Sequence, residues 1–192
     1  MTERFTVFDV ETPNAWNDRM SSIGVTLVEN GRIVSRFATL INPETRFDPF
    51  NISLTGIRPE DVRDKPTFSD LWPDLRPLME FGVLCAHNAP FDLRVLSSCL
   101  QDYGIAWERQ RPYVCTVRLS RKCFPNLPDH RLDTVSRALG IALEHHIASS
   151  DSDACAGILI RCLRFQGAYE ACRRVYDLRD QKTLLPKRVS AR

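Results

Sequence analysis

The chain has 192 residues, of which 26 are Lys or Arg and 24 are Asp or Glu, so its formal net charge is +2. Hydrophobic residues make up 43% of the chain and charged residues 26%, a composition that excludes disordered and collagen-like proteins. A chain of this length buries roughly 70% of the surface that it exposes when unfolded, which suits one globular domain. The near-neutral charge excludes no partner, because a nucleic-acid site can be a local basic patch.

Neither membrane segments nor disulfides are expected. No apolar run approaches the roughly 18 residues that a membrane span requires, and residues 1–4 lack the apolar stretch of a signal peptide. We therefore expect a cytoplasmic protein with no membrane partner. The seven cysteines are an odd number and the closest two are seven residues apart, which fits neither a disulfide framework nor a zinc-binding CxxC pair. We expect reduced thiols, most of them buried.

The first 40 residues predict three strands. Residues 5–10 form a short apolar run, apolar residues alternate over 23–27, and β-branched and aromatic residues return over 33–40. Asn30 and Gly31 supply the positive φ angles that a tight two-residue turn requires. This segment therefore predicts a strand followed by a hairpin.

The next forty residues give weaker signals. Residues 41–66 are rich in Pro, Asn and Asp, which predicts an irregular connection with one helical turn at 59–62. Apolar residues over 68–79 follow a helical period, but Pro73 and Pro77 each remove an interior hydrogen bond. We expect a kinked or broken helix there.

Helices and short strands then alternate. The pattern predicts strands at 83–86 and 113–117 and helices at 91–103, 131–139 and 151–165. Gly104 and Gly140 follow two of these helices, and Ser149 or Ser150 is predicted to cap the last one. Three early strands followed by this alternation predict an α/β fold, a mixed five-stranded sheet flanked by helices.

The end of the chain is basic. Residues 173–192 hold seven basic and two acidic residues, which is typical of a solvated tail or a frayed helix and less often of a segment that touches a polyanion. We therefore expect one domain over residues 1–170 and a basic C-terminal tail or helix over 171–192.

Common catalytic motifs do not occur in the sequence. It has no GxGxxG, GxxxxGK[ST], HExxH or GxSxG segment. The motifs that usually indicate a nucleotide-cofactor enzyme or a serine hydrolase are therefore missing from the sequence.

Four carboxylates occupy positions where a hydrophobic core would normally have apolar side chains. Asp9 and Glu11 are two residues apart in the first strand, so both side chains point to the same face. Asp92 and Asp151 each head the apolar face of a predicted helix, whereas Asp153 falls on the opposite side. The alternative is a purely structural role. Asp9 and Glu11 would then be the solvent-facing end of a strand, and Asp92 and Asp151 would only stabilise the starts of their helices.

Together the four carboxylates suit hard divalent cations, because carboxylate oxygens are the ligands that Mg²⁺ and Mn²⁺ prefer. Two such ions can activate water for attack on a phosphodiester. His145 and His146 precede the last helix, where an imidazole could accept a proton from that water. Two exposed loop histidines are the alternative reading.

Three segments carry these residues in order: Phe8-Asp9-Val10-Glu11-Thr12, Ala86-His87-Asn88-Ala89-Pro90-Phe91-Asp92 and His146-Ile147-Ala148-Ser149-Ser150-Asp151. They resemble the three motifs of the DEDDh-type 3′-to-5′ exonucleases, the family of the proofreading epsilon subunit of bacterial replicative DNA polymerase. The resemblance extends over residues 4–166. It implies a ribonuclease H-like fold and a metal-dependent exonuclease that releases nucleoside 5′-monophosphates from 3′ ends of single-stranded DNA.

The resemblance also implies residue roles. Asp9, Glu11, Asp92 and Asp151 would hold two Mg²⁺ or Mn²⁺ ions, with His146 as the general base. His146 is chosen over its neighbour because it precedes Asp151 by five residues, as the family base does, and adjacent residues in an extended loop point apart.

Substrate contacts follow in the same way. Thr12, Asn88 and Phe91 match motif positions that lie near the terminal nucleotide in the family. Pro13 and Thr55 differ from the residues that are frequent at these positions in the family. The differences affect the pocket for the terminal nucleotide, and hence the expected substrate preference, more than catalysis.

Two alternatives stay open at this point. The substrate could be RNA or short oligoribonucleotides, because no residue is identified that must contact a 2′-hydroxyl. A non-catalytic nucleic-acid-binding module on the same fold is the other, which four intact carboxylates disfavour. We expect a free-standing exonuclease whose partners are single-stranded 3′ ends, DNA before RNA, with any polymerase or repair partner unidentified.

Overall fold

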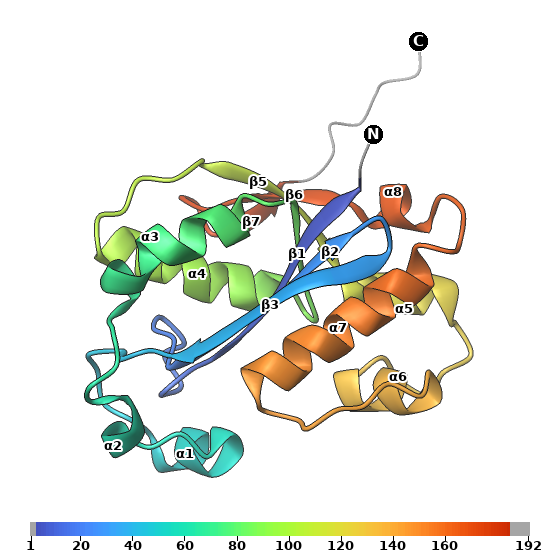
Figure 1. The fold of residues 1–192 in the computed structure, drawn as a ribbon. Helices are drawn as coiled ribbons and strands as arrows, with labels where there is room; N and C mark the ends of the chain where they lie inside the picture. Colours follow the sequence, from blue (N-terminus) through green and yellow to red (C-terminus); the bar gives the residue numbers. More distant parts are fainter. Residues whose placement is uncertain (1–2, 185–192) are drawn as a thin grey trace.

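A mixed seven-stranded sheet runs through the structure, a computed structural model that describes residues 3–184 (Figure 1). The strands are β1 (Arg4–Glu11), β2 (Ser22–Glu29), β3 (Arg32–Leu40), β4 (Val83–Ala86), β5 (Gln110–Cys115), β6 (Arg174–Asp177) and β7 (Lys182–Leu184). Their order across the sheet is β3-β2-β1-β4-β5-β6-β7. β1 is antiparallel to β2 and parallel to β4, so it lies where the two pairing patterns meet.

Helices cover both faces of this sheet (Figure 1). The helices of the described residues are α1 (Pro49–Thr55), α2 (Pro59–Val62), α3 (Phe68–Met79), α4 (Pro90–Asp102), α5 (Thr116–Cys123), α6 (Leu132–Ala138), α7 (Ala148–Cys162) and α8 (Ala168–Cys172), of which α1 and α2 belong to neither core. Helices α3 and α4 enclose one core with the sheet, and α5 to α8 enclose the other. None of the helices in the described part of the chain is long and apolar enough to cross a bilayer. The cytoplasmic location stays a prediction.

The N-terminal hairpin is as predicted. Asn30 and Gly31 adopt φ angles of 49° and 72°, and residues on either side pair antiparallel. Along β1, Phe5 and Val7 lie in the core under α7, while Phe8 and Val10 lie in the opposite core. This alternation puts residues 9 and 11 on the α7 face, at the end of the strand.

The sheet is larger than expected because the basic C-terminal segment contributes to it. Residues 174–177 pair with β5, and residues 182–184 pair with 174–177 in turn. The five-stranded expectation was therefore wrong by two strands, and the expected tail or helix over 171–192 is, up to Leu184, the end of α8 and a β-hairpin. Residues 185–192 lie outside the described part of the chain.

We expected a kinked or broken helix over 68–79, and α3 is continuous in spite of its two interior prolines, so a break is wrong. Thr67 accepts a hydrogen bond from the Asp70 amide (3.2 Å), and the Asp70 carboxylate accepts one from the Thr67 amide (3.0 Å), which forms a capping box. Its apolar side is buried over five residues: Phe68, Leu71, Trp72, Leu75 and Met79. Burial on this scale stabilises the helix by more than the hydrogen bonds that Pro73 and Pro77 remove.

Other helix boundaries also differ from the expectation. The segment after β5 forms α5 from Thr116, where the pattern had extended a strand to 117. The last long helix begins at Ala148 rather than 151, and its N-cap residue is Ile147 without a side-chain hydrogen bond. The expected serine cap is wrong, because Ser149 and Ser150 lie inside the first turn.

The start of α7 packs directly on β2. A Cβ atom on Gly24 would lie 2.1 Å from the carbonyl oxygen of Ala148, so only glycine permits this approach. The contact sets the first turn of α7 against the strand that pairs with β1, with Gly24 opposite Asp9 in the register.

All seven cysteines are buried free thiols, as expected. Two of them belong to the core under α3 and α4, and five to the core under α7: Cys99 and Cys115, and then Cys85, Cys123, Cys155, Cys162 and Cys172. Burial raises the pKa of Cys99 to about 12 and raises the pKa of Cys85 well above its usual value. At neutral pH these two groups are therefore protonated and unreactive.

Candidate active site

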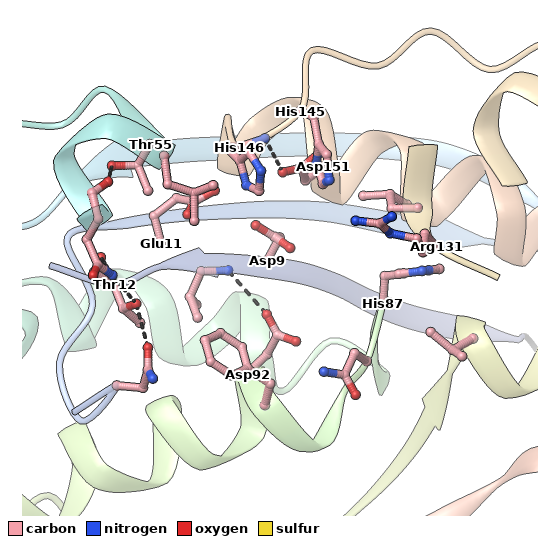
Figure 2. A pocket seen from close by; sticks show the side chains of 18 of the residues that line it. Asp9, Glu11, Thr12, Thr55, His87, Asp92, Arg131, His145, His146 and Asp151 are labelled. Atoms are coloured by element: carbon pink, nitrogen blue, oxygen red, sulfur yellow. Dashed lines mark hydrogen bonds and ion pairs between the residues drawn. The ribbon is translucent and has the colours of Figure 1, made fainter. Parts of the chain in front are cut away.

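A cavity of about 750 Å³ opens at the end of β1 (Figure 2). It is lined by the end of β1, the loop after β4, the first turns of α4 and α7, α1, α5, and the loops that precede α6 and α7. All eight residues that the sequence proposes as metal ligands, general base or substrate contacts lie on its wall: Asp9, Glu11, Thr12, Asn88, Phe91, Asp92, His146 and Asp151. Asp153 does not, since its carboxylate binds Arg36 of β3 (2.7 Å) and accepts a hydrogen bond from Thr26 of β2 (2.6 Å).

Three of the four carboxylates form one cluster. Oxygen atoms of Asp9, Glu11 and Asp151 all lie within 4.8 Å of one another. Asp9 and Glu11 share the α7 face of β1, and α7 brings Asp151 over them. Asp92 comes from α4 on the other side of the strand, where its carboxylate accepts a hydrogen bond from the Val10 amide (3.3 Å).

Three of the four carboxylates are largely removed from water, and Asp9 is partly exposed. Glu11, Asp92 and Asp151 are 8%, 2% and 3% exposed, respectively. Burial, and then the charges of Asp92, Asp151 and Glu11, raise the pKa of Asp9 well above its usual value. Burial, followed by the Asp151 charge, raises the pKa of Glu11 to about 7. The four negative charges are therefore costly to hold together without a compensating cation.

The residues present fit divalent cations. Within residues 3–184, no Lys or Arg lies within ion-pair distance of Asp9, Glu11, Asp92 or Asp151, and His145 is the basic partner that Asp151 has there (3.1 Å). Carboxylate oxygens form the hard donor set that Mg²⁺ and Mn²⁺ prefer. Asp9, Glu11 and Asp151 would hold a cation together, and Asp92 faces the same cavity.

The two histidines lie side by side, which differs from the expectation that their rings point apart. The ring planes of His145 and His146 stack at 4.0 Å with an angle of 13°. His146 has a φ of 67°, and this left-handed turn brings both rings into the cavity. His145 Nδ1 donates to Asp151 (3.1 Å), and the His146 amide donates to the other carboxylate oxygen (2.8 Å).

One end of the cavity carries no charge. It is formed by the loop after β1 and by α1, with the following lining residues: Thr12, Ala15, Asn17, Phe50, Asn51, Leu54 and Thr55. We call this the uncharged end. Buried Asn51 donates to the Thr12 carbonyl (3.0 Å) and ties α1 to the end of β1. Phe50 and Leu54 are 73% and 40% exposed, so apolar surface is open to a ligand there.

The opposite end is basic. It is lined by Arg121 of α5 and by His130 and Arg131 before α6, together with Asp129. We call this the basic end. Figure 2 shows Thr12 and Thr55 on one side of Asp9, and His87 and Arg131 on the other.

His87 anchors the loop at the basic end. Its ring lies between the Thr116 hydroxyl (Nδ1, 2.9 Å) and the His130 carbonyl (Nε2, 3.0 Å). Burial lowers the pKa of His87 to about 4, so the ring is neutral near pH 7. Because a carbonyl only accepts, Nε2–H donates to His130 and Nδ1 accepts from Thr116. The ring therefore acts as a fixed link between β4, α5 and the loop.

Several lining residues were not singled out from the sequence. Asn51, Phe50 and Leu54 lie in a segment whose composition predicted an irregular connection. Arg121 and Arg131 lie on elements with no motif. A useful signal was available only for His87, which falls within a quoted motif.

Comparison with known proteins identifies the family. A family model described as "Exonuclease" matches residues 6–159 of this chain. The chain belongs to that exonuclease family. The resemblance to DEDDh-type exonucleases is thereby confirmed, and this exonuclease is a nuclease that hydrolyses phosphodiesters.

The relatives of this exonuclease in sequence include PolC-type DNA polymerase III proteins. That of Clostridium perfringens is 33% identical over 192 residues, which cover 98% of this chain and 13% of the polymerase. That of Oceanobacillus iheyensis is 36% identical over 162 residues, or 82% of this chain and 11% of the polymerase. The chain thus spans only 11–13% of the length of these curated relatives.

Solved structures share the fold. Exonuclease X in complex with 5′-overhanging duplex DNA has a TM-score of 0.67 at 26% identity and covers 85% of this exonuclease and 92% of that chain. Exonuclease I has a TM-score of 0.75 at 18% identity, covering 88% of this chain and 43% of that one. The nuclease domain of 3′hExo, a DEDDh family member bound to rAMP, has a TM-score of 0.67 at 19% identity, covering 89% and 93%. The predicted ribonuclease H-like α/β class is confirmed.

Proposed function

We propose that this chain is a 3′-to-5′ exonuclease that removes nucleoside 5′-monophosphates from single-stranded DNA ends with two divalent cations, Mg²⁺ or Mn²⁺. The observation that carries the proposal is the cluster of Asp9, Glu11 and Asp151 within 4.8 Å, with Asp92 beside it and no Lys or Arg of residues 3–184 at ion-pair distance. The four carboxylates are the proposed metal ligands.

Cations bound there would stabilise the negative charge that develops on the scissile phosphate and the leaving oxygen. The chain itself supplies the proton acceptor. No described residue donates to or accepts from the ring nitrogens of His146, whereas the His145 ring is engaged with Asp151. Burial and the neighbouring His145 lower the pKa of His146, which favours the neutral ring. A free nitrogen of neutral His146 would therefore accept the proton of the attacking water.

The uncharged end suits the terminal nucleoside. Its apolar side chains, together with Phe91, offer surface on which a base can lie, and Thr12, Asn51 and Asn88 offer hydrogen-bonding groups for the sugar and base. A terminal base pair would have to open before one nucleoside could enter, at a cost of a few kcal/mol. Single strands are thus the proposed substrate form.

DNA is favoured over RNA because the sequence relatives are named as DNA polymerases. The same names suggest that this exonuclease domain works beside a polymerase, in the same chain or bound to it. A ribonuclease activity is the alternative outcome of the test.

The proposal is tested with four oligonucleotides, DNA and RNA, each labelled at the 3′ or the 5′ end, in Mg²⁺, Mn²⁺ or EDTA. We expect mononucleotides from the 3′ label and a shortening ladder from the 5′ label, with DNA degraded faster. The EDTA samples should stay intact. Release of mononucleotides from the 5′ label first would overturn the direction, and faster decay of RNA would overturn the substrate.

A further inference from the structure

We infer that Arg121 and Arg131 form a subsite for the backbone phosphates of the strand on the 5′ side of the scissile bond. The inference rests on the proposed function, since it assigns a binding role to the basic end of the same cavity. It names two residues that neither the family motifs nor the carboxylate chemistry requires.

The first support is the contrast between the two ends of the cavity. The uncharged end has no side chain that would compensate a phosphate, whereas the basic end carries two guanidinium groups and an imidazole. A strand with its terminal nucleoside at the uncharged end and its scissile phosphate over the carboxylates must continue toward Arg131, on the far side of Asp9 (Figure 2). Its next phosphates then reach positive charge.

The second support is that both guanidinium groups are available. Ten other Lys and Arg side chains in the described part of the chain form ion pairs, but neither Arg121 nor Arg131 forms one there. Asp129 is the acidic residue that shares this wall, and its carboxylate accepts a hydrogen bond from the Arg131 amide (3.0 Å). Both guanidinium groups therefore keep their donors for a ligand.

The third support is that the backbone beneath Arg131 is anchored. The His87 ring binds the His130 carbonyl (3.0 Å), and the His130 ring binds the Ser120 hydroxyl (3.0 Å). The loop is thereby tied to both the end of β4 and to α5, the helix that carries Arg121. A rigid backbone reduces the entropy that the arginines lose when they bind a phosphate.

The test uses Arg131→Ala and Arg121→Ala, with Arg118→Ala as the matched control. Arg118 is exposed on the same helix and does not line the cavity, so all three variants lose one surface charge. The Arg131 side chain makes no cap hydrogen bond at the start of α6, so its removal leaves the fold intact. Circular dichroism and melting temperature check this for each variant.

Binding of 5′-fluorescein-labelled dT10 is measured by anisotropy in Ca²⁺, at 50 to 300 mM salt, with a gel confirming that the oligonucleotide stays intact. We expect each cavity variant to raise the Kd about threefold to tenfold and to reduce the slope of log K against log salt by about 0.7, the value for one phosphate contact on a single strand. The control should change neither quantity. Equal effects in the control, or no effect in the cavity variants, would overturn the inference.

Turnover separates this inference from the proposed function. The dinucleotide TpT has only the scissile phosphate, so the cavity variants should hydrolyse it as the wild type does, while their KM for dT10 rises and kcat is kept. Loss of TpT hydrolysis in these variants would contradict a subsite beyond the scissile bond. A wild type that binds dT10 but cleaves neither substrate would refute the proposed function, and the anisotropy series would still decide the subsite.

Discussion

The carbonyl oxygen of Ala148 occupies the space that a side chain on Gly24 would need, at 2.1 Å from its Cβ position. Backbone therefore meets backbone where α7 crosses β2, three residues before Asp151. Because Gly24 pairs with Asp9 across β1 and β2, this contact sets the distance between carboxylates that come from opposite ends of the chain.

Gly24→Ala should therefore damage stability and cation binding together. The methyl group forces α7 away from β2, and overpacking of this kind costs about 1 to 3 kcal/mol. We expect a lower melting temperature by calorimetry and weaker Mg²⁺ binding by titration calorimetry. Gly157→Ala is the control. Gly157 lies on α7 six residues after Asp151, and its Cβ would lie 3.1 Å from the Ile141 side chain and not against backbone. Equal Mg²⁺ affinity in Gly24→Ala and the wild type would show that the contact does not position Asp151.

Asp92→Asn should uncouple stability from activity. Burial raises the pKa of Asp92 well above its usual value, so the ionised carboxylate costs stability, and the isosteric amide removes that cost while its oxygen can still accept from the Val10 amide. We expect a higher melting temperature in EDTA, a smaller gain on adding Mg²⁺, and turnover reduced by orders of magnitude. Nuclease rates equal to those of the wild type would contradict its assignment as a ligand.

His146→Ala should lower kcat by roughly 10² to 10⁴ while Mg²⁺ binding largely survives, as expected for loss of a general base. The kcat of His145→Ala should stay within a few-fold of that of the wild type. His145 stacks on His146 and binds Asp151, so the two variants remove neighbouring rings and differ in the role that we assign to each. Single-turnover rates and Mg²⁺ titrations on both variants provide the measurement. A crippled His145→Ala beside an active His146→Ala would reverse the assignment.

Stability without cations should fall as the pH rises through the titration of Glu11. Its pKa is raised to about 7 by burial and the Asp151 charge, against about 4.3 in an unfolded chain. Between these values the folded state holds a proton that the unfolded state lacks, so raising the pH removes at most about 4 kcal/mol of stability.

His87 acts in the opposite direction, since its pKa is lowered to about 4 by burial and acid therefore favours unfolding. The difference between wild type and Glu11→Gln isolates the Glu11 contribution. We expect the melting temperature of the wild type in EDTA to fall relative to that of Glu11→Gln from pH 5 to pH 8, and Mg²⁺ to restore more at pH 8 than at pH 5. Parallel curves for the two proteins would be the contrary result.

The carboxylate positions could be predicted because they depend on local periodicity. Period two along β1 puts Asp9 and Glu11 on one face, and helical period separates Asp151 from Asp153, which binds Arg36 outside the cavity. These relations hold however the elements pack. The roles of the four carboxylates and of His146 came instead from the resemblance of the three motifs to a known family.

The parts that escaped prediction depend on distant contacts or unusual backbone. The strand at 174–177 exists because β5 offers an edge to pair with, which a local basic composition does not reveal. The stacked histidines require a left-handed residue at position 146, a conformation that glycine or asparagine would have signalled. Asn51 lies on a seven-residue helix that a Pro-rich and Asn-rich stretch concealed.

Because all seven thiols are buried, we expect the folded protein not to react with alkylating reagents. Each thiol would react only when the structure around it opens, so its labelling rate measures the frequency of that opening. Cys99 would report on α4, and Cys155 and Cys162 on α7, the helix that carries Asp151. Site-by-site labelling with and without Mg²⁺ would thus show which half of the molecule a cation holds closed, with no engineered probe.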